Sequence, residues 1–193
     1  SGGVLGPVLL MMGLAHTSAA DASLLLNLES VLTAVLAWVV FRENADRRIV
    51  LGMLCIVAGG LLLAWPRHGD TQSSSTLGSL AVAGACLCWA VDNNLTRKVS
   101  AADAVFIAGT KGLVAGITNL ALAMALGATL PAWPRMAQAM SVGLAGYGVS
   151  LVLFVLALRG LGSARTGAYF STAPFIGAVI AIAGFHESST MAF

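Results

Sequence analysis

Long apolar runs alternate with short polar clusters along the whole chain. At about 1.5 Å per residue in a helix, most of these runs reach across the roughly 30 Å hydrocarbon core of a bilayer. The seven apolar runs span residues 2–15, 22–41, 49–65, 77–95, 104–126, 142–158 and 168–185. The pattern therefore predicts an all-α, polytopic membrane protein with about seven transmembrane helices.

Composition supports a lipid environment. Hydrophobic residues make up 58% of the chain and charged residues 9%, and the mean hydropathy is +0.90. A soluble domain carries about 25% charged residues, so this chain lacks the polar surface that water requires. Cys55, Cys86 and Cys88 lie inside apolar runs and are interpreted as small packing residues, without a disulfide framework.

The basic residues are unevenly distributed between the two faces. If the helices alternate in direction, the loops after the second, fourth and sixth helix share one face. The seven basic residues of these loops are Arg42, Arg47, Arg48, Arg97, Lys98, Arg159 and Arg165. The opposite loops hold only Arg67 and Arg135. The positive-inside rule then predicts a multi-pass protein of the cytoplasmic (inner) membrane, with loops 42–48 and 97–103 cytoplasmic.

A weak internal repeat links the two ends of the chain. Residues 24–43 have an echo at residues 168–187, where Glu187 stands for Glu43 and Phe185 for Phe41. The Ser/Thr-rich connection at residues 66–76 falls between the third and fourth helix, where a boundary between two repeats is expected. The two copies are five helices apart, an odd number, so they run in opposite directions and predict an inverted repeat.

Three stretches resemble the EamA domain of the drug/metabolite transporter superfamily. They are TSAADASLLLNLESVLTAVLAWVVFRE at residues 17–43, IVLGMLCIVAGGLLLAW at residues 49–65 and LGSARTGAYFSTAPFIGAVIAIAGFHE at residues 161–187. The first two resemble the first EamA domain of family members, and the third resembles the matching part of the second domain. Ser30 departs from the family pattern, because many relatives have Pro after the glutamate, and Arg42-Glu43 replaces the usual Gly-Glu.

The resemblance implies a ten-helix fold built from two inverted sets of five helices. Mapped onto that plan, the chain supplies helices three to nine, without helices one, two and ten. Residues 1–66 are then the end of the first EamA repeat, residues 67–76 a linker, and residues 77–193 the second repeat, truncated before its last helix. The resemblance also implies a transporter.

Two ionisable residues lie inside apolar runs. A charge near the bilayer centre costs at least about 2.5 kcal/mol, so each requires a reason to be there. Glu29 and Lys111 are both about seven residues from a helix end, or roughly 10 Å deep. Glu29 lines a substrate or proton path, or it binds backbone groups of a neighbouring broken helix. For Lys111 we favour a functional role.

Further polar candidates lie near these charges. Asn27 precedes Glu29 by two residues, and Trp89, Asp92 and Asn93 lie toward the end of the fourth helix. Amides and a carboxylate in a cavity suit an amino, hydroxyl or cationic substrate. The alternative for Asp92 and Asn93 is a solvated helix end, with Arg97 and Lys98 placed favourably at its C-terminus.

Two prolines lie inside apolar runs. Pro7 and Pro174 each free a backbone carbonyl, and interrupted helices often build the binding sites of transporters. Ser171 and Thr172, in the run Ser171-Thr172-Ala173-Pro174, are candidate substrate contacts, although a simple kink is the alternative. Two groups of glycines, one around Gly112 and one around Gly146, are interpreted as sites of close helix packing.

The sequence favours a secondary transporter, a probable exporter of a small organic metabolite or drug that works by alternating access. The alternatives are a non-transporting membrane scaffold and an intramembrane enzyme. An enzyme lacks support, because no nucleophile and base occur at a recognised spacing. His16, His68 and His186 have no partner at metal-ligand spacing, so no metal or cofactor is expected. The expected partners are a small-molecule substrate and the lipid bilayer, and no nucleic acid.

Overall fold

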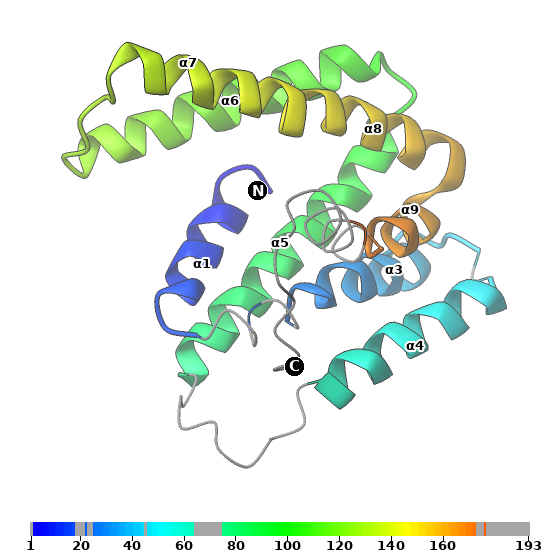
Figure 1. The fold of residues 1–193 in the computed structure, drawn as a ribbon. Coiled ribbons are helices and arrows are strands. Elements are labelled where there is room, and N and C mark those ends of the chain that lie inside the picture. The colour runs from blue at the N-terminus through cyan, green and yellow to red at the C-terminus, as the bar shows by residue number, and fades with distance from the viewer. Residues whose placement is uncertain are drawn as a thin grey trace.

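The computed structural model describes residues 2–17, 22, 25–44, 46–63, 75–172 and 176. Within these residues the regular elements are helices, and no strand occurs. The elements, shown in Figure 1, are α1 (Leu5–Leu14), α3 (Leu28–Val39), α4 (Arg47–Leu63), α5 (Thr76–Val99), α6 (Ala104–Ala125), α7 (Trp133–Val142), the π-helix η1 (Gly143–Val149), α8 (Ser150–Leu161) and α9 (Ser163–Phe170). The expected all-α class is confirmed.

Three of these segments are long and apolar enough to cross a membrane: Thr76–Val99, Ala104–Ala125 and Trp133–Leu161. The shorter apolar helices Leu5–Leu14 and Leu28–Val39 accompany them. Large apolar side chains such as Leu113, Leu120 and Leu153 are exposed on α6 and α8. A bilayer would cover such faces, as expected for a polytopic helical membrane protein.

The third long segment begins earlier than the sequence predicted. Residues 142–158 were expected to form the span, but one continuous run of helix extends from Trp133 to Leu161. Residues 135–141 lie before the apolar run from which the span was predicted. They are also rich in Met, Ala and Gln, which favour helices, and Pro134 lies in the first turn, where proline is tolerated.

The second predicted helix is shorter than expected. Residues 22–41 were expected to be one span, whereas α3 begins at Leu28 and ends at Val39. A turn at Asn27 separates α3 from the helical residues Leu25 and Leu26, so the expected helix is interrupted there. Most of residues 168–185, the linker at residues 67–76 and Pro174 lie largely or wholly outside the described residues. Pro7 lies in the first turn of α1, where its missing N–H requires no kink.

Helix α5 is the centre of the described structure. In Figure 1, α1 lies along one side of α5, and α3 and α9 lie against its other side. Glycines allow α1 and α5 to approach closely, because a Cβ on Gly6 would lie 2.5 Å from Trp89 Nε1 and one on Gly13 would lie 2.5 Å from Val82 Cγ2. Val82 and Cys86 on α5 form a buried apolar cluster with Ala22.

The three loops that were predicted to share one face do lie together, at one end of the structure. Ser163 N at the start of α9 donates to Glu43 Oε2 at 3.0 Å. The Arg165 guanidinium pairs with Asp46 at 3.1 Å. From the end of α8, Arg159 donates to the backbone carbonyls of the loop between α5 and α6. The alternation of helices inferred from the charges therefore agrees with these contacts.

The expected close packing at the glycines is wrong for most of them. A Cβ added to Gly109, Gly112 or Gly116 on α6 would meet nothing within 4 Å, and the same holds for Gly143 and Gly146. These glycines line an apolar groove of about 770 Å³ between α6 and the η1–α8 segment, or lie beside it. Helix α6 instead contacts α8 near its own start, where Ala104 and Ile107 pack with Val155.

Candidate functional site

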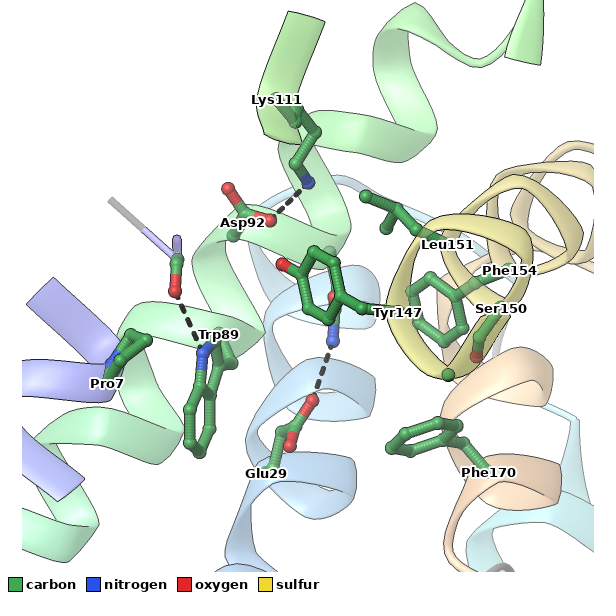
Figure 2. Close-up of a pocket in the computed structure, with 13 residues that line it drawn as sticks. Pro7, Glu29, Trp89, Asp92, Lys111, Tyr147, Ser150, Leu151, Phe154 and Phe170 are labelled. Atoms are coloured by element: carbon green, nitrogen blue, oxygen red, sulfur yellow. Dashed lines mark hydrogen bonds and ion pairs between the residues drawn. The ribbon is translucent and has the colours of Figure 1, made fainter. Parts of the chain in front are cut away.

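A cavity of about 350 Å³ lies beside the middle of α5. It is bounded by side chains from α1, α3, α5, α6, η1, α8 and α9, so helices from both ends of the chain contribute to it. The lining residues include five of the candidates predicted from the sequence, namely Glu29, Trp89, Asp92, Asn93 and Lys111. Figure 2 shows the side chains of Glu29, Trp89, Asp92 and Lys111 around one space.

Helix α5 contributes a polar face to the cavity. Asp92 and Asn93 each lie three or four residues from Trp89 and from Thr96, which places all four on one side of a helix. The alternative of a solvated helix end does not hold for Asp92 and Asn93. Both are partly buried and engaged by groups from neighbouring helices, whereas Lys98, near the end of α5, is exposed.

Asn93 holds the carboxylate of Glu29. Its Nδ2 donates to Glu29 Oε1 at 3.1 Å and lies 3.4 Å from Thr33 Oγ1, one turn further along α3. Because α3 begins at Leu28, Glu29 lies in the first turn of that helix. The partial positive charge of a helix N-terminus favours a carboxylate there. The sequence had placed Glu29 deeper, inside a longer helix.

Lys111 on α6 is held by two residues of α5. Its Nζ forms an ion pair with Asp92 Oδ2 and donates to Thr96 Oγ1 at 2.8 Å. The side chains of Lys111 and Asp92 are 26% and 22% exposed, so water reaches the pair through the cavity. The adjacent residues Asp92 and Asn93 thus connect α6 and α3 to the same turn of α5.

The start of the described chain closes one side of the cavity. Trp89 Nε1 donates to Gly2 O at 2.9 Å, and Asn119 Nδ2 on α6 donates to Gly3 O at 2.9 Å. A Cβ on Gly2 would lie 2.6 Å from Asp92 Cγ, so this backbone lies directly against the ion pair. Substituents larger than hydrogen at Gly2 would therefore displace Asp92.

Aromatic side chains form the opposite wall. Tyr147 from η1, Phe154 from α8 and Phe170 from α9 face the space from the side opposite Trp89 (Figure 2). The rings of Phe154 and Phe170 meet edge to face, with centroids 5.4 Å apart. Sequence reasoning missed these three residues. Aromatic residues are ordinary in apolar runs, and only the π-helical turn, which often marks functional sites, singles out Tyr147.

Three predicted candidates lie outside this cavity. Asn27 directly precedes α3 and is absent from the lining residues. Ser171 Oγ donates to Ala168 O and Thr172 Oγ1 donates to Tyr169 O, each at 2.7 Å. Both hydroxyls therefore satisfy carbonyls at the end of α9, and Thr172 borders a neighbouring hollow. At the end of α9, Phe170 lines the cavity that contains Glu29 and Lys111, whereas Ser171 and Thr172 do not.

The described part of the chain contains no group of three His, Cys, Asp or Glu side chains that could hold a metal ion. The charged groups of the cavity are instead engaged with one another and with amide or hydroxyl groups. The arrangement can bind a polar or charged group of a small molecule at one end and an apolar body against the aromatic rings.

Comparisons with known proteins match the chain to one sequence family and to two proteins named as transporters. The sequence profile of the EamA-like transporter family matches residues 1–65 and 76–192. An uncharacterized transporter of Methanothermobacter thermautotrophicus is 31% identical over 183 residues, which cover 92% of this chain and 53% of that protein. The uncharacterized transporter YyaM of Bacillus subtilis is 24% identical over 188 residues, covering 91% of this chain and 60% of that protein.

The chain thus spans little more than half the length of these relatives. No solved structure matches it. The family profile covers both the stretch before the Ser/Thr-rich connection and the stretch after it, and the described helices include three that are long and apolar enough to span a membrane. The chain belongs to the EamA-like transporter family.

Proposed function

We propose that the protein is a secondary transporter of the cytoplasmic membrane that exports a small organic metabolite or drug. The observation that carries this proposal is the cavity itself. Glu29 from α3 and Lys111 from α6 face one space of about 350 Å³, which lies within the range of small-molecule sites. Ionisable groups inside apolar segments are costly, and in transporters they mark substrate or ion pathways.

The pairing of the charges favours transport over a scaffold. A scaffold is expected to pair off each buried charge. Lys111 and Asp92 are paired with each other, but the described part of the chain supplies Glu29 with one neutral donor, the amide of Asn93. A carboxylate can accept about four hydrogen bonds, so Glu29 retains capacity for a proton or a ligand. No enzymatic role is proposed.

Alternating access requires one set of helices to move against another. Contacts at the end with the basic loops join residues from the two stretches that match the family. Glu43 binds the start of α9, and Asp46 binds Arg165. We propose that this end is cytoplasmic and that the contacts hold it closed, with the two inverted repeats rocking around the cavity when they separate.

The test is transport by the purified full chain in proteoliposomes, measured with a panel of radiolabelled amino acids, amines and toxic analogues. Glu29→Gln and Lys111→Met should each lower uptake per folded molecule about tenfold or more, because both line the proposed path. Thr118→Val is the matched control. Its hydroxyl lies on the same helix as Lys111 but is exposed and bound to its own helix, at Val114 O.

The outcomes separate the proposals. Uptake of a panel compound that Thr118→Val preserves and the two cavity variants lose would support transport through this cavity. Normal uptake in both cavity variants would remove these residues from the mechanism. No uptake of any compound by correctly folded protein, as judged by a cooperative unfolding transition, would support the scaffold.

A further inference from the structure

The charges that line the cavity are unequal. Two carboxylates, Glu29 and Asp92, face one ammonium group, Lys111. With all three ionised, one negative charge is in excess. Most of the cavity surface is apolar, which strengthens electrostatic interactions relative to bulk water, so that excess affects which ligands enter. An anion would face net repulsion, whereas a cation would restore neutrality.

Among the described residues, Glu29 is the cavity carboxylate that has no cationic partner. Asp92 already binds the Lys111 ammonium, and Thr96 Oγ1 accepts a further hydrogen bond from Lys111 at 2.8 Å. Glu29 is bound through Oε1 by Asn93, whose amide is neutral. A ligand carboxylate would have to displace Asp92 from Lys111 to find a positive partner. An ammonium group can bind Glu29 without breaking a contact between protein residues.

The aromatic walls suit the same ligand. In Figure 2, Glu29 lies between Trp89 on one side and Phe170 on the other, with the Tyr147 ring above it in the view. The face of an aromatic ring attracts cations, most strongly for Trp and then Tyr. The same rings, with Phe154, offer apolar surface for the body of a ligand. The site therefore combines a carboxylate with rings that favour positive charge.

We propose that this cavity selects organic monocations, namely amines with an aromatic or branched apolar body, and that their ammonium group binds Glu29 between Trp89 and Tyr147. The proposal rests on the proposed transport function and names its substrate class. Lys111 and Asp92 act as a neutral pair that keeps the rest of the wall from attracting anions. The cavity volume limits the ligand to a small one.

Binding of four compounds with the same phenyl ring tests the charge preference directly. They are phenethylamine, a cation; phenylalanine, a zwitterion; 3-phenylpropionate, an anion; and 2-phenylethanol, which is neutral. Isothermal titration calorimetry on the detergent-solubilised full chain at pH 7 measures each affinity without membrane permeation. Phenethylamine should bind about tenfold or more tightly than any of the other three.

Variants identify the groups responsible. Glu29→Gln should weaken phenethylamine about tenfold and leave 2-phenylethanol nearly unchanged, because it removes the charge and keeps the shape. Tyr147→Leu should weaken phenethylamine about threefold or more and 2-phenylethanol less, because it removes the ring face and keeps an apolar side chain. Thr118→Val, outside the cavity, should leave all four affinities as they are.

Tighter binding of phenylalanine or 3-phenylpropionate than of phenethylamine would overturn the cation preference, and so would equal binding of all four. Failure of all four to bind would overturn it as well. None of these outcomes contradicts the proposed transport function if the uptake assay with the radiolabelled panel identifies another substrate. Conversely, cation binding without uptake of any compound would leave the cavity preference standing and overturn transport.

Discussion

Asn93 Nδ2 donates to Glu29 Oε1 at 3.1 Å, and the residue before it, Asp92, binds Lys111 on another helix. Two consecutive side chains of α5 therefore bind Glu29 and Lys111, the two ionisable residues that the sequence places inside apolar runs. Because Glu29 belongs to α3 and Lys111 to α6, any movement of α3 against α6 must alter at least one of these contacts. This relationship makes α5 the natural place to test the mechanism.

Replacing Asn93 with Ala removes the donor to Glu29. A hydrogen bond to a charged group contributes about 1.5 to 3 kcal/mol, so we expect lower thermal stability and a large loss of transport. Thr118→Val is the control, since its hydroxyl donates to Val114 O of its own helix and lies outside the cavity lining. Equal transport per folded molecule in the two variants would show that the Asn93 contact is structural only.

The Lys111–Asp92 pair should behave as a unit. Lys111→Met and Asp92→Asn each leave one charge without its partner, at a cost of about 1 to 3 kcal/mol for a partly buried group. The double variant leaves neither charge, so its loss of stability should be clearly smaller than the sum of the two single losses. Unfolding in detergent measures all three. Additive losses would mean that the ion pair contributes no coupling energy.

Glu43, which lies far from α9 in the sequence, should stabilise the start of that helix. Its carboxylate accepts from Ser163 N at 3.0 Å and lies 3.5 Å from Ala164 N, where the helix dipole also favours negative charge. Glu43→Ala should therefore cost about 0.5 to 2 kcal/mol, and Glu43→Gln less. Protease cleavage near residues 160–165 would report the loosening. Unchanged protection in Glu43→Ala would contradict this capping role.

Asp46 predicts a pH dependence outside the membrane. A hydrogen bond from Arg48 N, assisted by Arg165, lowers the pKa of Asp46 below its ordinary value of 3.8. A lowered folded-state pKa means that the stabilisation is fully present above about pH 4 and is lost as the pH falls through the folded value. The stability difference between wild type and Asp46→Asn should be constant from pH 7 to 5 and shrink below pH 4.

The other carboxylates titrate in both proteins, so the comparison isolates Asp46. Thermal unfolding in detergent at a series of pH values measures the difference. A gap that widens on acidification would have the wrong sign and would contradict the assignment.

Membrane orientation is open to labelling. In a variant in which Cys55, Cys86 and Cys88 are replaced by Ser, a single cysteine at Asn44 should be protected from an impermeant maleimide added to intact cells. A single cysteine at Ser73 should react. Seven basic residues in one set of loops, against two in the other, give this expectation. The reverse pattern would overturn both the orientation and the proposed direction of opening.

The free-energy cost of placing charged groups in apolar segments explains which site residues could be predicted from the sequence. Glu29 and Lys111 were identifiable because charges are expensive in apolar segments, and Asp92 and Asn93 because they are polar residues near the end of such a segment. The existence of helices and the shared end of the basic loops followed from apolar length and charge. These features depend on interactions with solvent or lipid that each residue has independently of its neighbours.

Partners far along the chain were not predictable in the same way. Nothing in residues 40–46 indicates that Glu43 binds a helix that starts 120 residues later. The aromatic wall was missed because Phe154 and Phe170 resemble any other apolar residue until packing places them. The start of α3 and the early start of α7 depended on a balance between local helix propensity and polarity, which apolar run length does not measure.

The π-helical turn at Gly143–Val149 sets the direction in which the side chains of α8 point. Its hydrogen bonds span one residue more than those of an α-helix, so α8 leaves the turn rotated relative to the course that α7 would have set. Tyr147 lies within the turn and Phe154 lies beyond it, yet both reach the same cavity. Loss of a single residue between Tyr147 and Phe154 would preserve the helix and its hydrophobicity but rotate one ring by about 100° relative to the other. The aromatic wall therefore depends on the number of residues between the two rings as much as on their being aromatic.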